Sequence, residues 1–588
     1  MKGLRGWIGR SGLGQLTTAS NRLVEQLGVQ VMFCGYISDR QELLGQTACP
    51  LGGYPTDELV IAYAYRRWGR DLQAHVVGDF AAVVYEPATH EALLTHDALG
   101  LRPLFYRLKG DTIVFADEVL DLTEMDEEID ECYLADVLAI GFIASERTPY
   151  RGIQRLLPGH SLHWSRNRGL VRRVWNLASI QPMRYSSDEQ YEEHFRSLLW
   201  DAVRSTLPSR GAVWVSLSGG LDSSTIAGVA ADLKVPSLAA YSHICEEWPE
   251  ADERRWMREV VTMHSLPWHQ QDIAAVAPFA KLPTIPYGEP SAIAISERQL
   301  EVENELFAKH GVSVVLNGFG GDDILGRDSG RLPSHLADPL FDGQPLRALR
   351  ELNEWRAGSM EQRSKTYWLV RGLLQPAADH LMGRRVRRRD QRFLYPPWIR
   401  PDYALRMKLT SRAERQVAPR CRYPGLQGVW TALWLQSIAL ATLPRSRMSY
   451  ERRHPLAYRP LVEFMCAIPW EQKLRPRCDR YLQRRALKGV LPELVRRRAT
   501  KGSGSPAMVE YLRRSPDWVD YLCESPALAS HGVVEVEAWR NMVRNASVGQ
   551  TIDDRFFMAG VMVEVWLKQF EQRRAALGAD TTQRQVLQ

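Results

Sequence analysis

Several features that would place a chain in a broad class are missing here. No apolar run reaches the roughly 20 residues that cross a membrane, and the best candidate, residues 430–443, is interrupted by Gln436 and Thr442. The start of the chain lacks the long apolar core of a signal peptide. The 8 cysteines are scattered, and no two have the spacing of a zinc or redox pair. We therefore expect a cytoplasmic protein with no membrane contact and no disulfide framework.

The charges give little indication of a polyanionic partner. The net charge is +6 over 588 residues, although arginines cluster at 384–389 and again at 496–501. Such runs are usually solvated faces. The aromatic residues that stack on bases in a strand-binding groove are not interleaved with these arginines. We therefore expect no nucleic-acid partner.

The length and the residue pattern predict two domains of different class. At roughly 100–200 residues per domain, the chain has room for at least two. Residues 1–180 are rich in short alternating segments, such as the predicted strand 29–33 and the capped helix 56–68. A polar stretch, 181–190, is typical of a linker. We place the first domain, of α+β type, at 1–180 and the second domain at 181–588.

The second domain begins with a strand–helix rhythm. Residues 212–217 form a continuous apolar run, which is typical of a strand buried on both faces of a parallel sheet. Further strands are predicted at 237–241 and 312–316, with a helix at 252–264 between them. This alternation predicts a doubly wound α/β sheet, and the region from 335 to 575 adds mostly helices.

The strongest motif is Ser-Leu-Ser-Gly-Gly-Leu-Asp-Ser-Ser at 216–224, between a predicted strand and a helix. Glycines let the backbone approach an anion, and the free amides of a helix N-terminus bind phosphate. Asp222 adds a carboxylate beside the bound phosphates, which is favourable only with a cation between them. The motif therefore predicts a site for a nucleotide with magnesium.

A second loop, Asn-Gly-Phe-Gly-Gly-Asp-Asp at 317–323, follows the strand at 312–316. Together the two loops resemble those of the ATP-pyrophosphatase superfamily in the form found in asparagine synthetases. The resemblance implies that the chain cleaves ATP between the α and β phosphates and activates a carboxylate as an acyl-adenylate. It implies that magnesium is held by Asp222 and Asp322. It implies ATP contacts from Leu217, Ser218, Gly219, Gly220, Asp222, Ser223, Ser224, Gly318 and Gly320.

Two further residues match the same family. Glu451, in Ser-Tyr-Glu-Arg-Arg-His-Pro-Leu at 449–456, resembles its Glu-x-Arg-x-Pro element, and Lys501 follows the second arginine cluster. The resemblance implies that Glu451 orients the intermediate or helps to remove a proton. It implies that Lys501 stabilises the charge that develops when an amine attacks the adenylate. Both are predicted to be catalytic.

Residues 28–120 resemble the glutaminase domain of the same family, which implies a sandwich of the Ntn-hydrolase type. That glutaminase needs a cysteine directly after the initiator methionine, but Lys2 occupies this position and no cysteine precedes Cys34. Where the family has Asn-Gly-Glu, this chain has Cys34-Gly35-Tyr36. We therefore predict a degenerate domain that makes no ammonia and serves as a scaffold or docking surface.

A synthetase without an ammonia source must receive its amine ready-made. Two relatives of the family do so, namely the β-lactam synthetases and the lasso-peptide cyclases. Phe319 stands where asparagine synthetases carry glutamate and where the β-lactam enzymes carry tyrosine. The helical region offers the arginine cluster 384–389 and large apolar side chains, which favours a peptide substrate. These are Trp355, Trp368, Trp398, Trp430 and Trp434.

These features favour a peptide macrolactam cyclase of the lasso type. The alternatives are a β-lactam or other small-molecule amide synthetase and an asparagine synthetase that uses free ammonia. The cyclase resemblance implies three partners. They are a precursor peptide as substrate, a leader peptidase and a leader-binding protein.

Overall fold

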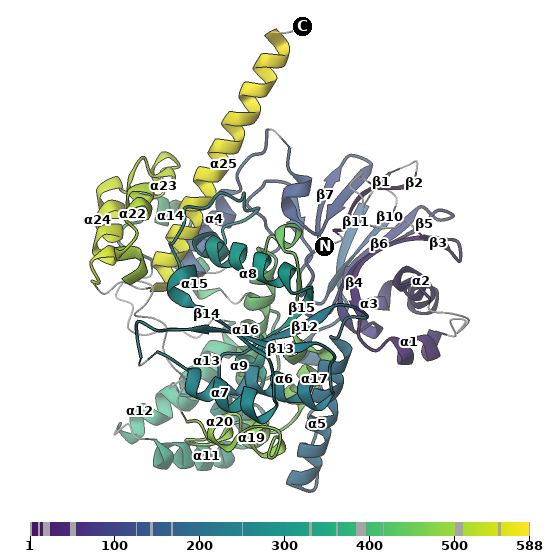
Figure 1. Cartoon of the computed structure of the whole chain (residues 1–588), viewed down its shortest axis with the longest axis vertical. Coiled ribbons are helices and arrows are strands. Elements are labelled where there is room, and N and C mark those ends of the chain that lie inside the picture. The colour runs from purple at the N-terminus through teal and green to yellow at the C-terminus, as the bar shows by residue number, and fades with distance from the viewer. Residues whose placement is uncertain are drawn as a thin grey trace.

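The computed structural model describes residues 3–9, 12–15, 24–47, 55–124, 126–141, 145–165, 168–249, 251–327, 332–359, 363–383, 395–415, 417–499, 510–550 and 554–586. An antiparallel two-sheet sandwich forms the N-terminal part, and a parallel sheet with many helices forms the rest (Figure 1). The long C-terminal helix α25 (Asp554–Val586) projects from the body of the molecule in this view. The predicted fold class is confirmed in both parts.

The N-terminal sandwich consists of one five-stranded and one six-stranded antiparallel sheet. Their strand orders are β2-β1-β8-β7-β9 and β11-β10-β6-β5-β4-β3. The first sheet contains β1 (Arg5–Gly9), β2 (Gly12–Gln15), β7 (Phe105–Lys109), β8 (Thr112–Ala116) and β9 (Ile153–Arg155). The second contains β3 (Val24–Gln26), β4 (Val29–Ile37), β5 (Gly78–Glu86), β6 (Glu91–His96), β10 (His160–Ser165) and β11 (Arg168–Arg173).

The alternation of side chains builds two apolar layers on the six-stranded sheet. Met32 and Leu94 face the other sheet and pack in one buried cluster with Phe115. Phe33 and Val60 belong to a second cluster, in which the helix α2 (Asp57–Trp68) covers the outer face. The α2 helix begins where the sequence predicted, with the Thr56 hydroxyl accepting a hydrogen bond from a first-turn amide.

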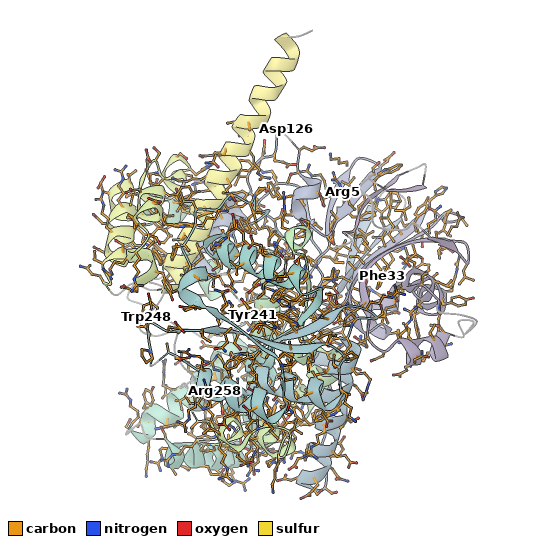
Figure 2. All side chains as sticks on the ribbon, in the orientation of Figure 1. Arg5, Phe33, Asp126, Tyr241, Trp248 and Arg258 are labelled. Atoms are coloured by element: carbon orange, nitrogen blue, oxygen red, sulfur yellow. The ribbon has the colours of Figure 1, made fainter. Side chains whose placement is uncertain are left out.

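The five-stranded sheet of the C-terminal part is parallel throughout, with the order β14-β13-β12-β15-β16. Its strands are β12 (Ala212–Ser216), β13 (Leu238–Ile244), β14 (Trp268–Asp272), β15 (Val312–Leu316) and β16 (Glu451–Arg453). β12 is the middle strand of this sheet, in agreement with its continuous apolar run. Its residues Val213 and Val215 are buried. Phe33 and Tyr241 locate the sandwich and the parallel sheet among the side chains in Figure 2.

Helices on both faces of this sheet complete the doubly wound arrangement. The polar segment predicted as a linker is shorter than expected, because the helix α5 already begins at Asp188 with two acidic residues in its first turn. The helix α5 (Asp188–Ser205) precedes β12. The helices that follow the strands are α6 (Leu221–Asp232), α7 (Arg254–Met263), α8 (Glu297–Lys309) and α9 (Gly321–Ile324).

The remaining helices form the predicted additions. A π-helical turn at Val370–Leu374 joins α12 (Lys365–Leu369) to α13 (Gln375–Leu381). Pro376 explains this turn, because proline cannot donate the i→i−4 hydrogen bond. The N-terminal part contains α1 (Arg40–Thr47), α3 (Leu72–His75) and α4 (Glu131–Ile140). The additions are α10 (Asp338–Phe341), α11 (Pro345–Gly358), α12 (Lys365–Leu369), α13 (Gln375–Leu381), α14 (Pro401–Arg406), α15 (Leu409–Glu414), α16 (Pro424–Leu440), α17 (Arg459–Ala467), α18 (Trp470–Lys473), α19 (Tyr481–Ala486), α20 (Glu493–Arg496), α22 (Pro516–Cys523), α23 (Ala527–Ser530) and α24 (Val536–Ser547).

One apolar cluster runs through both parts of the chain. Leu101 and Phe105 of the sandwich belong to the same buried cluster as Leu316 and Leu456 of the α/β part. The two parts therefore share a core. Among the described residues, no helix combines the length and the apolar character that crossing a membrane requires.

Candidate active site

A cavity of about 320 Å³ opens at the carboxyl ends of two neighbouring strands, β12 and β15. The next strand along the chain, β13, lies on one side of β12, whereas β15 lies on its other side. This is the topological switch point of the sheet, where open α/β sheets bind ligands. Both predicted loops reach this cavity, since Ser216 ends β12 and Asn317 follows β15.

The first loop is held open by hydrogen bonds between its own residues. The hydroxyl of Ser223 lies 3.0 Å from that of Ser218 and accepts from the Ser218 amide at 3.1 Å. Gly219 has φ +71, and a Cβ there would lie 3.1 Å from Trp256. Gly220 begins α6 as its N-cap without a side chain in front of the first amides. The helix N-terminus therefore faces the cavity free to bind an anion.

Not all of the predicted phosphate contacts line the cavity. Ser218, Gly220, Asp222 and Ser223 do line it. Leu217, Gly219 and Ser224 are outside the lining. Leu217 and Ser224 are buried in the core beneath the loop, because alternate positions of the strand end and the inner face of α6 point away from the cavity.

The second loop packs directly onto the first. Gly318, Gly320 and Asp322 all line the cavity, as predicted. A Cβ at Gly321 would lie 2.6 Å from the carboxyl carbon of Asp222, which real side chains do not tolerate. The glycines of this loop are therefore needed because they bring the carboxylates of Asp222 and Asp322 to the same place.

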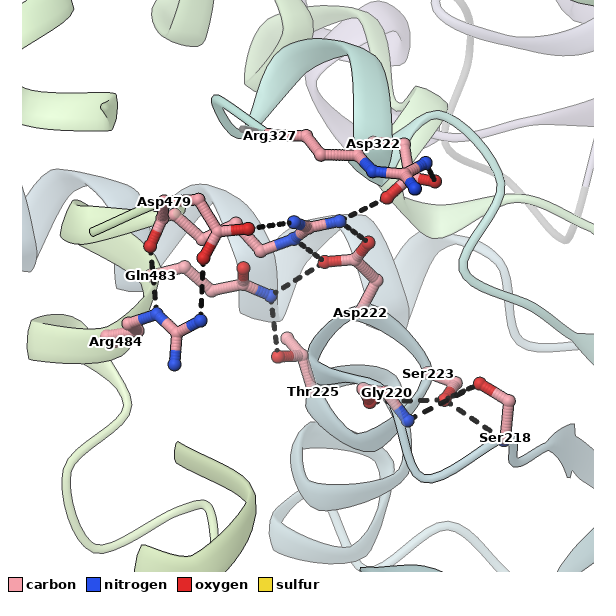
Figure 3. A network of polar contacts seen from close by, with 11 residues as sticks. Ser218, Gly220, Asp222, Ser223, Thr225, Asp322, Arg327, Asp479, Gln483 and Arg484 are labelled. Carbon is pink, nitrogen blue, oxygen red and sulfur yellow. Dashed lines mark hydrogen bonds and ion pairs between the residues drawn. The ribbon is translucent and has the colours of Figure 1, made fainter. Parts of the chain in front are cut away.

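Arg480 joins these two carboxylates. Its guanidinium donates to both oxygens of Asp222 at 2.9 and 2.8 Å and also bonds Asp322. Asp479 accepts from it at 2.8 Å. Figure 3 shows Asp222, Asp322 and Asp479 facing the same space. Burial lowers the pKa of Arg480, but the contacts with Asp222 raise it more, so this side chain stays charged.

The same oxygens suit a divalent cation. Asp222 and Asp322 both contact one guanidinium, so their carboxylates lie close enough together to share a single ion. Carboxylate oxygens are the ligands that magnesium prefers, completed by phosphate oxygens and water. Asp222 and Asp322 are therefore the residues that would hold magnesium here.

Three arginines of the cavity were not identified from the sequence. Arg480, Arg484 and Arg498 line it alongside the first loop. Arg498 donates to the carbonyl of Gly219 at 3.0 Å and lies 3.9 Å over the ring of Trp256. It belongs to the cluster 496–501 that read as a solvated face, so only its burial distinguishes it. The cavity thus combines three arginines with three carboxylates, of which Asp222 and Asp322 would pair with a metal ion and Asp479 pairs with Arg480 and Arg484. This arrangement suits a polyphosphate bound together with a cation.

Phe319 forms an apolar wall of the cavity beside a buried histidine. Its ring lies 4.8 Å from that of His454, and both residues contact Asn317. Burial lowers the pKa of His454 to about 4, so this imidazole is neutral near pH 7. The wall is therefore uncharged at the position where the family carries glutamate or tyrosine.

Glu451, predicted to be catalytic, is placed differently. It is not among the residues that line the cavity within the described part of the chain. Its carboxylate accepts from Arg102 at 2.6 Å and from Arg453 at 2.6 and 2.9 Å. Burial alone would raise the pKa of Glu451, but Arg453 and Arg102 lower it to about 2. A carboxylate held by two arginines has little affinity for a proton, so this arrangement favours the orienting role over proton removal, and the catalytic role of Glu451 stays a prediction.

Two other predictions cannot be followed in the structure or are corrected by it. Lys501 and the arginine cluster 384–389 lie outside the described residues. The tryptophans were expected to offer surface to a peptide. This is wrong for four of them, because Trp368, Trp398, Trp430 and Trp434 are at most 4% exposed and belong to the core.

Cys34, the first cysteine in the sequence, is not accessible to solvent. Cys34 is 4% exposed and its thiol lies 3.7 Å from a carboxylate oxygen of Asp117. Burial and the charge of Asp117 raise the pKa of Cys34 well above its usual value. A thiol in this environment stays protonated and is a poor nucleophile.

Comparisons with known proteins agree with this arrangement. The family model described as asparagine synthase matches residues 194–568, and the model described as glutamine amidotransferase domain matches residues 39–175. The glutamine-hydrolyzing asparagine synthetase 3 of Bacillus subtilis (strain 168) is 26% identical over 79% of this chain and 73% of its own. The glutamine-hydrolyzing asparagine synthetase 1 of the same organism is 24% identical over 82% and 76%.

A putative glutamine-hydrolyzing asparagine synthetase of Mycobacterium tuberculosis (strain ATCC 25618 / H37Rv) is 24% identical over 90% of this chain and 82% of its own. The asparagine synthase model covers more than half of the chain and includes both loops of the cavity. The chain therefore belongs to the asparagine synthase family and is an ATP-dependent amide-bond-forming ligase.

Proposed function

We propose that this ligase is a peptide macrolactam cyclase of the lasso-peptide type. It would adenylate the side-chain carboxylate of an Asp or Glu in a precursor peptide and join it to the N-terminal amine of the same peptide. The observation that carries this proposal is the contrast between the two regions. Both predicted loops line the cavity of the ligase, whereas the buried Cys34 provides no means of releasing ammonia.

The cavity residues account for the first step. Serine hydroxyls and helix amides of the first loop bind the phosphates of ATP, with Arg480, Arg484 and Arg498 around them. A peptide carboxylate oxygen attacks the α phosphorus, and the bond from that phosphorus to the oxygen bridging to the β phosphate breaks. Pyrophosphate leaves, and the arginines stabilise its charge. When bound, magnesium supplies charge neutralisation between the phosphates and Asp222 and Asp322.

The second step needs positioning more than acid–base chemistry. The neutral amine attacks the acyl carbon, the bond to AMP oxygen breaks, and the amine proton passes to solvent. Holding the amine and the acyl carbon together can supply roughly 7–11 kcal/mol of the barrier. The uncharged wall of Phe319 and neutral His454 keeps a competing charge away from the acyl group.

A ready-made amine is supported from two sides. Cys34 is buried and protonated, and Phe319 brings no hydroxyl or carboxylate to the cavity. The choice of a peptide over a small molecule rests on the resemblance to lasso-peptide cyclases. The same resemblance implies a leader peptidase and a leader-binding protein as partners, and a cavity that holds the peptide tail within the closing ring.

Mass spectrometry tests the proposal directly. The purified protein is incubated with MgATP and a linear, leader-free peptide encoded beside its gene, with the partner peptidase present. Loss of one water from the peptide together with AMP release is expected. The Asp222→Ala variant should form neither product.

The alternatives have their own signatures in the same assay. Asparagine formed from aspartate and ammonium salts would identify an ammonia-dependent asparagine synthetase. AMP release driven by small amino acids, with the peptide unchanged, would identify a small-molecule amide synthetase. Either result contradicts the cyclase proposal but leaves the ligase assignment intact.

A further inference from the structure

A row of side chains with alternating charge extends from the sandwich into the ligase part, namely Asp79, Arg102, Glu451 and Arg453. Arg102 is 2% exposed. It donates to Asp79 at 3.2 Å within the sandwich and to Glu451 at 2.6 Å across the boundary. The other oxygen of Glu451 is held by Arg453. The two arginines keep Glu451 charged in a buried place, since they lower its pKa.

Arg453 extends the connection further. Its guanidinium donates to the carbonyl of Thr206, beyond the end of α5, at 2.9 Å. It also lies 4.2 Å over the ring of Tyr36 on β4 of the sandwich. The strand β16, which consists of Glu451–Arg453, is thus fixed from the sandwich and from α5.

This short strand supports the second loop of the cavity. It pairs with β15 at the edge of the sheet, with Leu316 opposite Arg453. The amide of Asn317 then donates to the carbonyl of Arg453 at 3.3 Å, and the ring of His454 bonds the Asn317 side chain at 2.8 Å. The position of the loop that carries Asp322 therefore depends on where β16 lies.

We infer that Arg102 is a positioning residue for the nucleotide cavity, acting through Glu451 and β16 on the loop 317–322. A three-residue edge strand has few hydrogen bonds of its own, so its side-chain contacts set its place. The ion pair from the sandwich does so at Glu451, and the bond of Arg452 to Glu303 at 2.7 Å does so on the ligase side. This gives the degenerate N-terminal domain a task in the ligase reaction without any glutaminase chemistry. The inference does not depend on which acid and amine are joined.

A second buried ion pair across the same boundary provides a matched control. Arg155 of β9 donates to Glu289 at 2.5 Å, and both side chains are at most 3% exposed. This pair is more buried than the Arg102–Glu451 pair, whose glutamate is 18% exposed, but it contacts neither β16 nor the cavity lining among the described residues. It therefore reports what loss of an interdomain ion pair does to stability alone.

The test compares Arg102→Met, Arg102→Lys and Glu451→Gln with Arg155→Met in the full-length protein. We measure the KM for ATP in ATP–pyrophosphate exchange, with the leader-free precursor peptide supplying the carboxylate that is adenylated. Hydrogen exchange of the peptide spanning residues 312–325 is measured in parallel and needs no acid substrate. Arg102→Met and Glu451→Gln should each raise the KM by about tenfold and speed exchange in that peptide. Arg102→Lys should restore part of the effect, because lysine keeps the charge.

The double variant Arg102→Met with Glu451→Gln should be no worse than either single change, because both remove the same contact. Arg155→Met should lower the melting temperature without changing the KM for ATP. An unchanged KM in Arg102→Met, or an equal rise in Arg155→Met, would overturn the inference. If Arg102→Met does not fold, Arg102→Lys and Glu451→Gln decide it, and wild-type KM and exchange in both overturn it.

Discussion

The two regions of this chain both bury carboxylates beside arginines, but they use them differently. In the sandwich and at its boundary, Arg102 fills the space between Asp79 and Glu451, and no oxygen of Glu451 faces the cavity. At the ends of β12 and β15, Arg480 holds Asp222 and Asp322 at the wall of an open cavity. The same residue types thus form a buried structural ion-pair network at the boundary, Arg102–Glu451–Arg453, and a ligand site at the cavity. The difference between them is whether the carboxylates are accessible to solvent.

The sharpest way to break this comparison is to remove a carboxylate from the cavity. Asp222→Ala should lower ATP-dependent turnover by about a thousandfold, because the phosphates lose their cation-binding partner and Arg480 loses its bidentate contact. The rate of AMP formation measures this. Asp232→Asn, at the far end of the same helix, serves as the control and should stay near the wild-type rate. Activity in Asp222→Ala would show that the cavity is not the reaction site.

Arg480 should have the next largest effect. Arg480→Met leaves Asp222 and Asp322 beside each other without their shared cation, and turnover should fall about a hundredfold. Arg327 also pairs with Asp322, at 2.7 Å, but is 46% exposed. Arg327→Met should therefore cost less than about threefold, since exposed ion pairs contribute little. Equal losses in steady-state assays of the two variants would contradict the assignment of Arg480 to the site.

The ion pairs of Glu451 with Arg102 and Arg453 should make the unfolding free energy depend on pH. The pKa of Glu451 is lowered from 4.5 to about 2 in the folded chain, so its ion pairs stabilise the fold fully above pH 4.5. As the pH falls from 4.5 toward 2, this contribution, at most about 3 kcal/mol, is lost. Urea unfolding between pH 3 and pH 7 measures it. Glu451→Gln should make the unfolding free energy fall less steeply between pH 4.5 and pH 3. An unchanged slope in this variant would contradict the assigned ion pairs of Glu451.

The smallest effect is expected at the thiol of the sandwich. Cys34→Ala should leave ATP-dependent turnover within about twofold and lower the unfolding free energy by about 1 kcal/mol, because the buried thiol packs in the core and makes one weak hydrogen bond, to Asp117. Turnover with glutamine as the amine source and chemical denaturation measure the two quantities. Glutamine-dependent amide formation that disappears in Cys34→Ala would restore a glutaminase role to this domain.

Continuous motifs were the part of the site that could be predicted. The first and second loops lie where the pattern placed them, because a glycine turn between a buried strand and a helix N-terminus is a local structure. Their approach to each other follows from parallel strands ending at the same edge of a sheet. Within the first loop, however, Leu217 and Ser224 point into the core, which the motif alone does not reveal.

Residues outside continuous motifs were predicted less well. Trp430 and Trp434 read equally as core or as peptide surface, because an apolar helix has no pattern that identifies its partner. Arg480 and Arg498 were missed because arginines in a basic region, whether single or in a run, carry no local signal of their contacts. Each acquires its role from a carboxylate or a carbonyl far away along the chain.

The amino-acid sequence by itself determined the class of this protein. Alternating and continuous apolar patterns specify the sandwich and the parallel sheet, and two glycine loops specify a phosphate site, because backbone conformation and side-chain direction are set by neighbouring residues. Only the tertiary structure decided that Glu451 forms a buried ion pair with Arg102, 349 residues away. It also decided that Arg480 stands between the two aspartates, because the energy of a charge depends on burial and on partners brought together by folding.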